Sequence, residues 1–101
     1  LWIDGELVLF FHERDATGRY TVRVALLDAD TGHAVSSLPD PIMVPTLPWE
    51  RCGDVDDVVF VEGAVLRPDG QVYLTYGAAD RCVGAFTVSG DDVVAALRAA
   101  A

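Results

Sequence analysis

The chain of 101 residues is long enough for one small domain or for part of a larger protein, and 51% of its residues are hydrophobic, which argues against intrinsic disorder. Its 16 acidic and seven basic residues give a formal net charge of −9, so nucleic acid and anionic membranes are not expected as partners, because both require clustered Lys and Arg. We also expect neither a signal peptide nor a transmembrane helix.

Six β-strands are predicted, because short runs rich in Val, Phe, Tyr, Thr and Leu alternate with turn sequences. The predicted strands are Glu6–Phe11, Tyr20–Leu27, Ala34–Ser37, Val58–Val65, Gln71–Tyr76 and Val83–Val88. Asp-Gly pairs at 4–5 and 69–70 are strong turn signals. The fold class is therefore all-β.

The remaining chain is predicted as one irregular connection and one short helix. Proline cannot donate to a sheet ladder, so the prolines at 39, 41, 45 and 48 predict an extended, irregular connection. Asp91–Ala101 is predicted to be helical, with acids in its first turn and Ser89 or Asp91 as the N-cap.

A turn and the strand that follows it occur twice. Asp4–Phe11 resembles Asp69–Tyr76, and Val22–Asp28 resembles Val83–Ser89. A repeat of roughly 60 residues with three or four strands is typical of propeller blades. Because two blades do not close a ring and leave an apolar flank uncovered, we expect a longer protein or association into a homo-oligomer.

The segment Glu50–Phe60 reads ERCGDVDDVVF and is followed by Gly63-Ala64 and by Tyr76–Asp80, YGAAD. This order is similar to that of glycoside hydrolase family 130, whose motif is close to ER-x-GDVPNVVF-x-x-GA and then YYGAAD. Phe11-His12 and Tyr20–Asp28 resemble the family's YHG and its Y-R-x-GAALLD segment. The resemblance covers essentially the whole chain.

The resemblance implies a five-bladed β-propeller, of which this chain forms about the last two blades and a short C-terminal helix. Residues 1–48 are then one blade and its connection, residues 49–90 are the final blade, and residues 91–101 are the helix. The partners implied are the missing N-terminal blades and an oligosaccharide.

The activity that the resemblance implies is phosphorolysis of β-mannosides, in which inorganic phosphate displaces the aglycone and gives α-mannose 1-phosphate. No other cofactor is implied. Hydrolysis of the same substrates is the alternative, and a non-catalytic carbohydrate-binding or structural module is an alternative from another class. The general-acid Asp of the family lies in its N-terminal half, so this chain alone is expected to be inactive.

Asp54 is the first candidate for substrate binding. Gly53 permits a close approach to a ligand or a positive φ, and a carboxylate accepts hydrogen bonds from two sugar hydroxyls. Judged without the resemblance, a turn or strand-cap acid is the simpler interpretation of Asp54. Asp56 and Asp57 stand where the family has Pro and Asn, and Asp57 is a second candidate. A calcium loop is not predicted, because DVDD lacks the required spacing.

His12 is the candidate for phosphate binding, because the resembled family uses the histidine of YHG there and His supplies hydrogen-bond donors. Judged without the resemblance, a hydrogen-bonded structural residue is the simpler interpretation of His12. Glu13 is unfavourable beside an anion unless it points away or pairs with Arg14. The remaining candidates for substrate binding are Trp49, Tyr76 and Asp80. For Asp80, an ion pair with Arg81 within a turn is the simpler interpretation.

The two cysteines, Cys52 and Cys82, fit neither a zinc motif nor a disulfide framework. We predict free thiols, which are typical of an intracellular protein, and therefore a cytoplasmic location.

Overall fold

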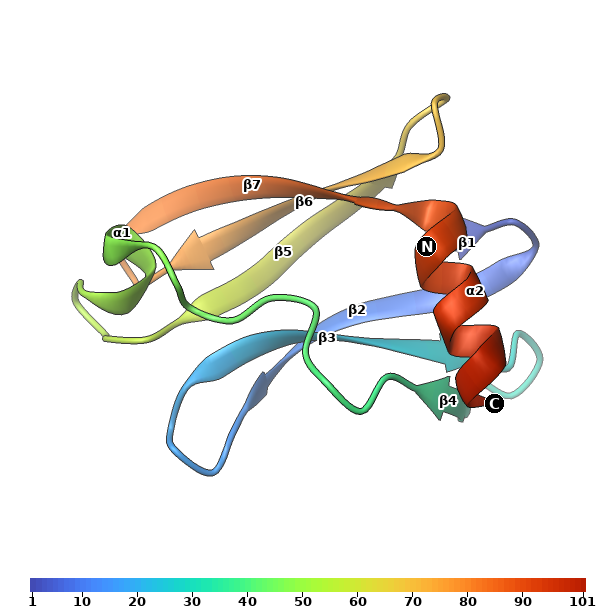
Figure 1. The fold of residues 1–101 in the computed structure, drawn as a ribbon, viewed down its shortest axis with the longest axis horizontal. Coiled ribbons are helices and arrows are strands. Elements are labelled where there is room, and N and C mark those ends of the chain that lie inside the picture. The colour runs from blue at the N-terminus through green and yellow to red at the C-terminus, as the bar shows by residue number, and fades with distance from the viewer.

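Two antiparallel sheets and a C-terminal helix make up the chain in a computed structural model that describes residues 1–101 (Figure 1). The first sheet has the strand order β1-β2-β3-β4 and the second has the order β5-β6-β7. The strands of the first sheet are β1 (Trp2–Ile3), β2 (Glu6–Arg14), β3 (Tyr20–Leu27) and β4 (Ala34–Ser37). Those of the second are β5 (Val59–Leu66), β6 (Gln71–Ala78) and β7 (Cys82–Ser89). The helices are α1 (Pro48–Arg51) and α2 (Gly90–Ala100).

The six predicted strands and the C-terminal helix are confirmed, with shifted ends. Ser89 is the N-cap of α2, since its hydroxyl accepts a hydrogen bond from the Asp92 amide at 3.2 Å. The prediction of an irregular connection up to Pro48 was wrong at its end, where α1 begins. Proline is favoured in the first turn of a helix because its missing N–H has no partner there.

The repeated sequence corresponds to a repeated structure. Both β2 and β6 follow a tight turn and occupy the second position of their sheets. Asp4 and Gly5 adopt φ values of 49° and 77° before β2, and Gly70 has a φ of 85° before β6. Since β-branched and bulky residues avoid this region, Asp-Gly supplies the turn in both places. The first sheet has a fourth strand that the second sheet lacks.

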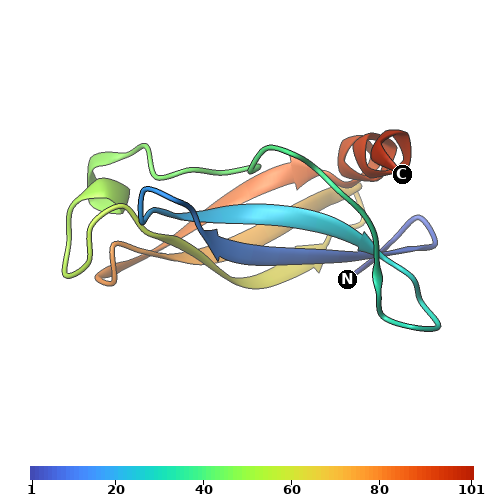
Figure 2. The same cartoon turned by 90° about the horizontal axis from the view of Figure 1, so that it is seen from below.

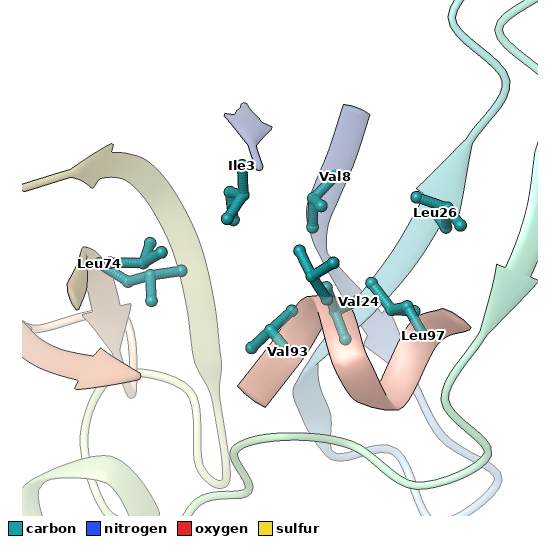
Figure 3. Packing of buried hydrophobic residues seen from close by; sticks show 9 residues of the cluster. Ile3, Val8, Val24, Leu26, Leu74, Val93 and Leu97 are labelled. Atoms are coloured by element: carbon teal, nitrogen blue, oxygen red, sulfur yellow. The ribbon is translucent and has the colours of Figure 1, made fainter. Parts of the chain in front are cut away.

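The core lies between the two sheets and is closed at one end by α2. Its larger cluster joins both sheets and the helix (Figure 3). That cluster consists of Ile3, Val8, Val24, Leu26, Val72, Leu74, Val93, Val94 and Leu97. The buried Ser36 hydroxyl donates to the Leu97 carbonyl at 2.8 Å and fixes the helix to β4. In Figure 2 the strands run along the molecule and α2 lies at one end.

The opposite end carries the polar loops. There α1, residues 52–58, the β6–β7 turn and the β2–β3 hairpin lie at the same end of the molecule, on the left of Figure 1. Hydrogen bonds join these segments, because Tyr20 N donates to Asp57 O at 3.1 Å and Val55 N donates to Ala79 O at 3.0 Å. Most of the candidate residues therefore belong to one end of the fold.

The outer face of the second sheet is apolar and uncovered. Val65, Tyr73 and Val83 are 61%, 40% and 73% exposed. Val65 pairs with Tyr73, and Val83 pairs with Gly77, which lies four residues further along the same face of β6. No other part of the chain covers these three side chains. Neither helix is long and apolar enough to cross a membrane.

Candidate functional site

Two loops at the polar end of the second sheet are packed directly against each other. A Cβ on Gly53 would lie 2.4 Å from the carbonyl oxygen of Ala79, so only glycine fits there. Gly53 does not have a positive φ, and its close neighbour is this chain rather than a ligand. The close neighbour of Gly53 is therefore the loop between β6 and β7.

Asp54 and Arg81 form an ion pair across these two loops. Arg81 NH2 donates to Asp54 Oδ1 at 2.9 Å, and the two side chains are 65% and 58% exposed. The expected pair between Asp80 and Arg81 is therefore wrong. Asp54 Oδ2 makes no hydrogen bond within the chain and faces solvent as a free acceptor. The sequence alone does not predict that Arg81 pairs with Asp54, because the two residues are 27 positions apart and no local pattern connects them.

Asp56 and Asp57 contribute to the shape of the loop. Asp56 Oδ1 accepts from Gly53 N at 3.3 Å, and Asp57 Oδ1 lies 3.4 Å from Arg51 Nε. Asp57 has a φ of 56°, a left-handed conformation that Asp and Asn tolerate better than other non-glycine residues. Asp57 can thus adopt the same backbone conformation as the Asn that the resembled family has at this position, but its carboxylate lacks the hydrogen-bond donor of the Asn amide.

A pocket of ≈ 210 Å³ lies beside the loops. It is lined by Val58, Phe60, Glu62, Gly77 and Asp80. Glu62 sits at a β-bulge between Val61 and Gly63, and its carboxylate lies over Gly77 of the middle strand, 3.3 Å from where a Cβ of that glycine would be. An aromatic ring beside two carboxylates suits a sugar, because the ring covers C–H groups and the carboxylates accept hydroxyl hydrogens.

Phe60 and Glu62 were missed by the sequence analysis. The only signal for them is one acid that interrupts the apolar run from Val58 to Val65. Asp57 does not join this pocket. It lines a wider hollow of ≈ 460 Å³ beside α1, together with Arg51 and Asp56. Asp57 and Asp80 therefore line separate depressions, and Asp54 lines neither of them.

His12 reaches the same end of the second sheet from β2. Its ring stacks on Phe60 with a centroid distance of 3.5 Å and an interplanar angle of 27°. Glu13 is paired with Arg23 rather than with Arg14, since Arg23 NH1 donates to Glu13 Oε2 at 2.9 Å. Successive strand residues face opposite sides, so Arg14, which forms no ion pair within the chain, lies on the side of His12.

Tyr76 is buried, with only 2% of its surface exposed, and its hydroxyl donates to Glu50 Oε2 at 2.5 Å. Burial, followed by the hydrogen bond and the negative charge of Glu50, raises the pKa of Tyr76 above its ordinary value. The hydroxyl is thus engaged inside the protein. Trp49 stacks on the Tyr76 ring at 5.9 Å and 21°, and 37% of Trp49 is exposed.

No group of three or more His, Cys, Asp or Glu side chains in the chain is arranged to hold a metal ion. Cys52 and Cys82 are exposed, free thiols, as predicted. The chemistry available at this end of the fold is therefore hydrogen bonding by carboxylates, stacking by exposed aromatic rings and donation by His12 and Arg14.

Exposed carboxylates beside aromatic rings at one end of a β-sheet frame are typical of proteins that act on carbohydrates. The chain belongs to glycoside hydrolase family 130. The model of that family, described as beta-1,4-mannooligosaccharide phosphorylase, matches residues 3–99.

Two relatives of known activity come from Thermoanaerobacter sp. (strain X514). A beta-1,2-mannobiose phosphorylase is 40% identical over 91 residues, which cover 89% of this chain and 30% of the relative. A 1,2-beta-oligomannan phosphorylase is 31% identical over 86 residues, covering 84% of this chain and 29% of the relative. The chain thus spans less than a third of the length of these relatives.

Solved structures show the same fold. The beta-1,2-mannobiose phosphorylase of Listeria innocua, in complex with beta-1,2-mannobiose, superposes with a TM-score of 0.88 at 23% identity and covers 98% of this chain and 28% of that protein. A protein described as a putative glycoside hydrolase from Parabacteroides distasonis has a TM-score of 0.75 at 26% identity, over 90% of this chain and 29% of that protein.

Proposed function

We propose that this chain is the C-terminal part of a phosphorylase that cleaves β-mannosyl oligosaccharides with inorganic phosphate and yields α-mannose 1-phosphate. The observation that carries the proposal is the Asp54–Arg81 pair, which leaves one carboxylate oxygen free at the exposed end of a family 130 chain. The activities of the two Thermoanaerobacter relatives support the same substrate class.

The two sheets are, in this proposal, about the last two blades of a five-bladed propeller. Residues 1–48 form one blade and its connection, residues 49–90 form the final blade, and residues 91–101 belong to the closing helix. Support comes from the repeated turn and strand and from the uncovered apolar face at Val65, Tyr73 and Val83, which the N-terminal blades of the whole protein would cover. The protein is proposed to act in the cytoplasm.

Asp54 is proposed to hold the glycone. Its free oxygen accepts hydrogen bonds from ring hydroxyls, while Arg81 fixes the other oxygen and so limits rotation of the carboxylate. Asp80, with Phe60 and Glu62, offers a second set of contacts in the adjoining pocket. Asp57 and Trp49 extend the polar and aromatic surface around α1 and are proposed to contact further sugar units.

His12 is proposed to help bind phosphate, with Arg14 as a second donor on the same side of β2. The pairing of Glu13 with Arg23 supports this assignment, because it removes the adjacent negative charge from the anion. Positioning of the anion beside the anomeric carbon is a large part of what such a site supplies. No cofactor other than phosphate as co-substrate is required.

The reaction forms a bond from a phosphate oxygen to the anomeric carbon and breaks the bond from that carbon to the aglycone oxygen. The aglycone oxygen receives a proton from an acid that is proposed to lie outside this chain. All the residues assigned here bind substrate rather than transfer the proton, so the isolated chain is proposed to be inactive.

The test uses the purified full-length protein with β-1,2-mannobiose, with and without inorganic phosphate. Phosphorus NMR detects α-mannose 1-phosphate, and we expect it only when phosphate is present. Release of mannose at the same rate without phosphate would identify a hydrolase instead. Binding of the disaccharide with no turnover in either condition would identify a non-catalytic carbohydrate-binding protein.

A further inference from the structure

Glu50 is a buried carboxylate that the proposed chemistry does not use. Only 1% of its surface is exposed, and it forms no ion pair. We propose that Glu50, acting with Tyr76, is a positioning residue that fixes both Trp49 and the Asp54 loop for oligosaccharide binding. The identity of the substrate in this inference rests on the proposed function. The positioning role itself rests on the geometry around Glu50.

The Glu50 side chain joins two separate parts of the chain. Its Oε1 accepts hydrogen bonds from the backbone N–H groups of Thr46 and Leu47, each at 2.9 Å. Its Oε2 accepts from Tyr76 Oη at 2.5 Å. The carboxylate is therefore held by three donors, two from the connection before α1 and one from the middle strand of the second sheet.

The backbone around Glu50 closes the loop that carries Asp54. Val58 N donates to Glu50 O at 3.2 Å, and Asp57 N donates to Arg51 O at 3.1 Å. Both ends of residues 52–57 thus meet at Glu50 and its neighbour. A change in the position of α1 must move the loop, and with it the free oxygen of Asp54.

Glycine at position 84 of β7 gives independent support. A Cβ there would lie 2.5 Å from Tyr76 Cζ and 2.8 Å from Trp49 Cη2. The strand therefore carries no side chain at the one point where the Tyr76 ring and the Trp49 indole stack above it. The Tyr76 ring is thus held by its hydrogen bond to Glu50 and has room to lie against β7 because residue 84 has no side chain. The Trp49 indole, which stacks on Tyr76, is positioned by the same two features.

Helix capping explains only one of the two oxygens of Glu50. Oε1 accepts from Thr46 N and Leu47 N at the start of α1, whereas the hydrogen bond from Tyr76 to Oε2 links the helix to the second sheet. A fully satisfied buried polar network of this kind specifies one arrangement. The arrangement specified here keeps the Trp49 indole parallel to Tyr76 and partly exposed, next to the loop of Asp54. A planar exposed ring beside a hydroxyl acceptor is the geometry that a sugar unit requires.

The experiment compares Glu50→Gln, Tyr76→Phe and Val72→Ala in the full-length protein. Tyr76→Phe keeps the ring under Trp49 but removes the donor to Glu50, and Glu50→Gln keeps the size while replacing one acceptor by a donor. Val72 is fully buried in the same strand but belongs to the larger core cluster rather than to that of Tyr76, so its variant controls for lost stability.

We expect Glu50→Gln and Tyr76→Phe to raise the KM for β-1,2-mannobiose about tenfold, the size of one lost hydrogen bond to a charged group, with the KM for phosphate unchanged. Val72→Ala should lower the unfolding temperature and leave both KM values unchanged. Equal KM changes in all three variants, or lower unfolding temperatures alone, would overturn the inference.

A second measurement does not depend on the substrate. In protein labelled with 5-fluorotryptophan, the Trp49 fluorine line is assigned by its loss in Trp49→Phe. We expect this line to shift or broaden in Glu50→Gln and in Gly84→Ala, and to stay in place in Val72→Ala. An unmoved Trp49 line in Glu50→Gln overturns the inference, whereas an inactive wild-type protein with a shifted line overturns only the proposed function.

Discussion

Arg81 and Asp54 are 27 positions apart in the chain, yet their side chains meet at 2.9 Å across the end of the second sheet. The contact occupies one oxygen of Asp54 and leaves the other to solvent. Since both side chains are more than half exposed, the pair contributes little to folding, about 0–1 kcal/mol. The role of the ion pair is instead to orient the Asp54 carboxylate, so that its free oxygen points in a fixed direction.

Asp54→Asn in the full-length protein is expected to lower kcat/KM for β-1,2-mannobiose about 10- to 100-fold, because an amide is a weaker acceptor than a carboxylate for two sugar hydroxyls. The free energy of unfolding should change by less than about 1 kcal/mol. Steady-state kinetics and chemical unfolding measure the two effects. Asp69→Asn, in the turn at the far end of β6, is the control, and an equal kinetic loss there would contradict the assignment.

His12→Gln and Arg14→Gln are each expected to raise the KM for phosphate about tenfold, because a neutral amide is a weaker donor to an anion than the side chain it replaces. The KM for the disaccharide should stay unchanged. Both constants come from initial rates at varied phosphate. Arg67→Gln, in the β5–β6 turn, removes an equal charge far from the site and should change neither constant. A uniform change in both constants for His12→Gln would assign that residue to folding instead.

Gly53→Ala is expected to destabilise the protein by about 1–3 kcal/mol, because the added Cβ would lie 2.4 Å from the Ala79 carbonyl and 2.6 Å from the Ala79 Cβ. Urea unfolding provides the measurement. Gly77→Ala is a matched control, since the nearest neighbour of its Cβ would be the flexible Glu62 side chain at 3.3 Å, with the Phe60 carbonyl oxygen at an ordinary contact distance of 4.0 Å. If Gly77→Ala costs as much as Gly53→Ala, the close contact of the loops is not the cause.

Leu97→Ala is expected to cost about 2–5 kcal/mol, because Leu97 is fully buried between α2 and both sheets and its removal leaves a cavity. Val35→Ala, at a side chain of β4 that is 53% exposed, should change stability by no more than about 0.5 kcal/mol. The two variants are compared by urea unfolding under identical conditions. Similar losses in both would indicate that α2 does not pack as described.

The β2–β3 hairpin should respond to acid through Asp15. Hydrogen bonds from the Thr17 and Arg19 side chains, with two backbone donors, hold the pKa of Asp15 well below its usual range. A carboxyl whose folded pKa is depressed stabilises the fold above its unfolded pKa, about 3.9, and loses that contribution as pH falls toward the folded pKa. Asp15→Ala should therefore lower the unfolding temperature by a constant amount from pH 7 to about 5, and by less below about 4. A difference that does not narrow in acid would contradict this assignment.

The sequence predicts the strands well because each is a run of β-branched and aromatic residues bounded by a turn of known chemistry. Helix α1 escaped prediction because its stability depends on Glu50, whose partners Thr46, Leu47 and Tyr76 come from both sides of it. Thr46 and Leu47 lie within four residues of Glu50, but Tyr76 lies 26 positions away, and the helix propensity of four residues does not reveal that contact.

The site was only partly predictable for the same reason. Asp54 stands out in sequence because it follows a glycine and precedes an apolar strand. Arg81, Phe60 and Glu62 are recognisable only when the register of β5 against β6 and the bulge at Glu62 are known. Tyr76 was expected to bind substrate, and its burial against Glu50 favours a supporting position instead.

The attachment of α2 to the first sheet has a consequence for the order in which the protein acquires its structure. Ser36 and Leu97 are 61 positions apart, and Arg98 reaches Glu6 across 92. Loop closure over such separations is slow compared with hairpin formation. During synthesis, the first sheet leaves the ribosome before residue 97 has been added. The inner face of that sheet is therefore exposed to chaperones and to other nascent chains until α2 has been synthesised and packs against it.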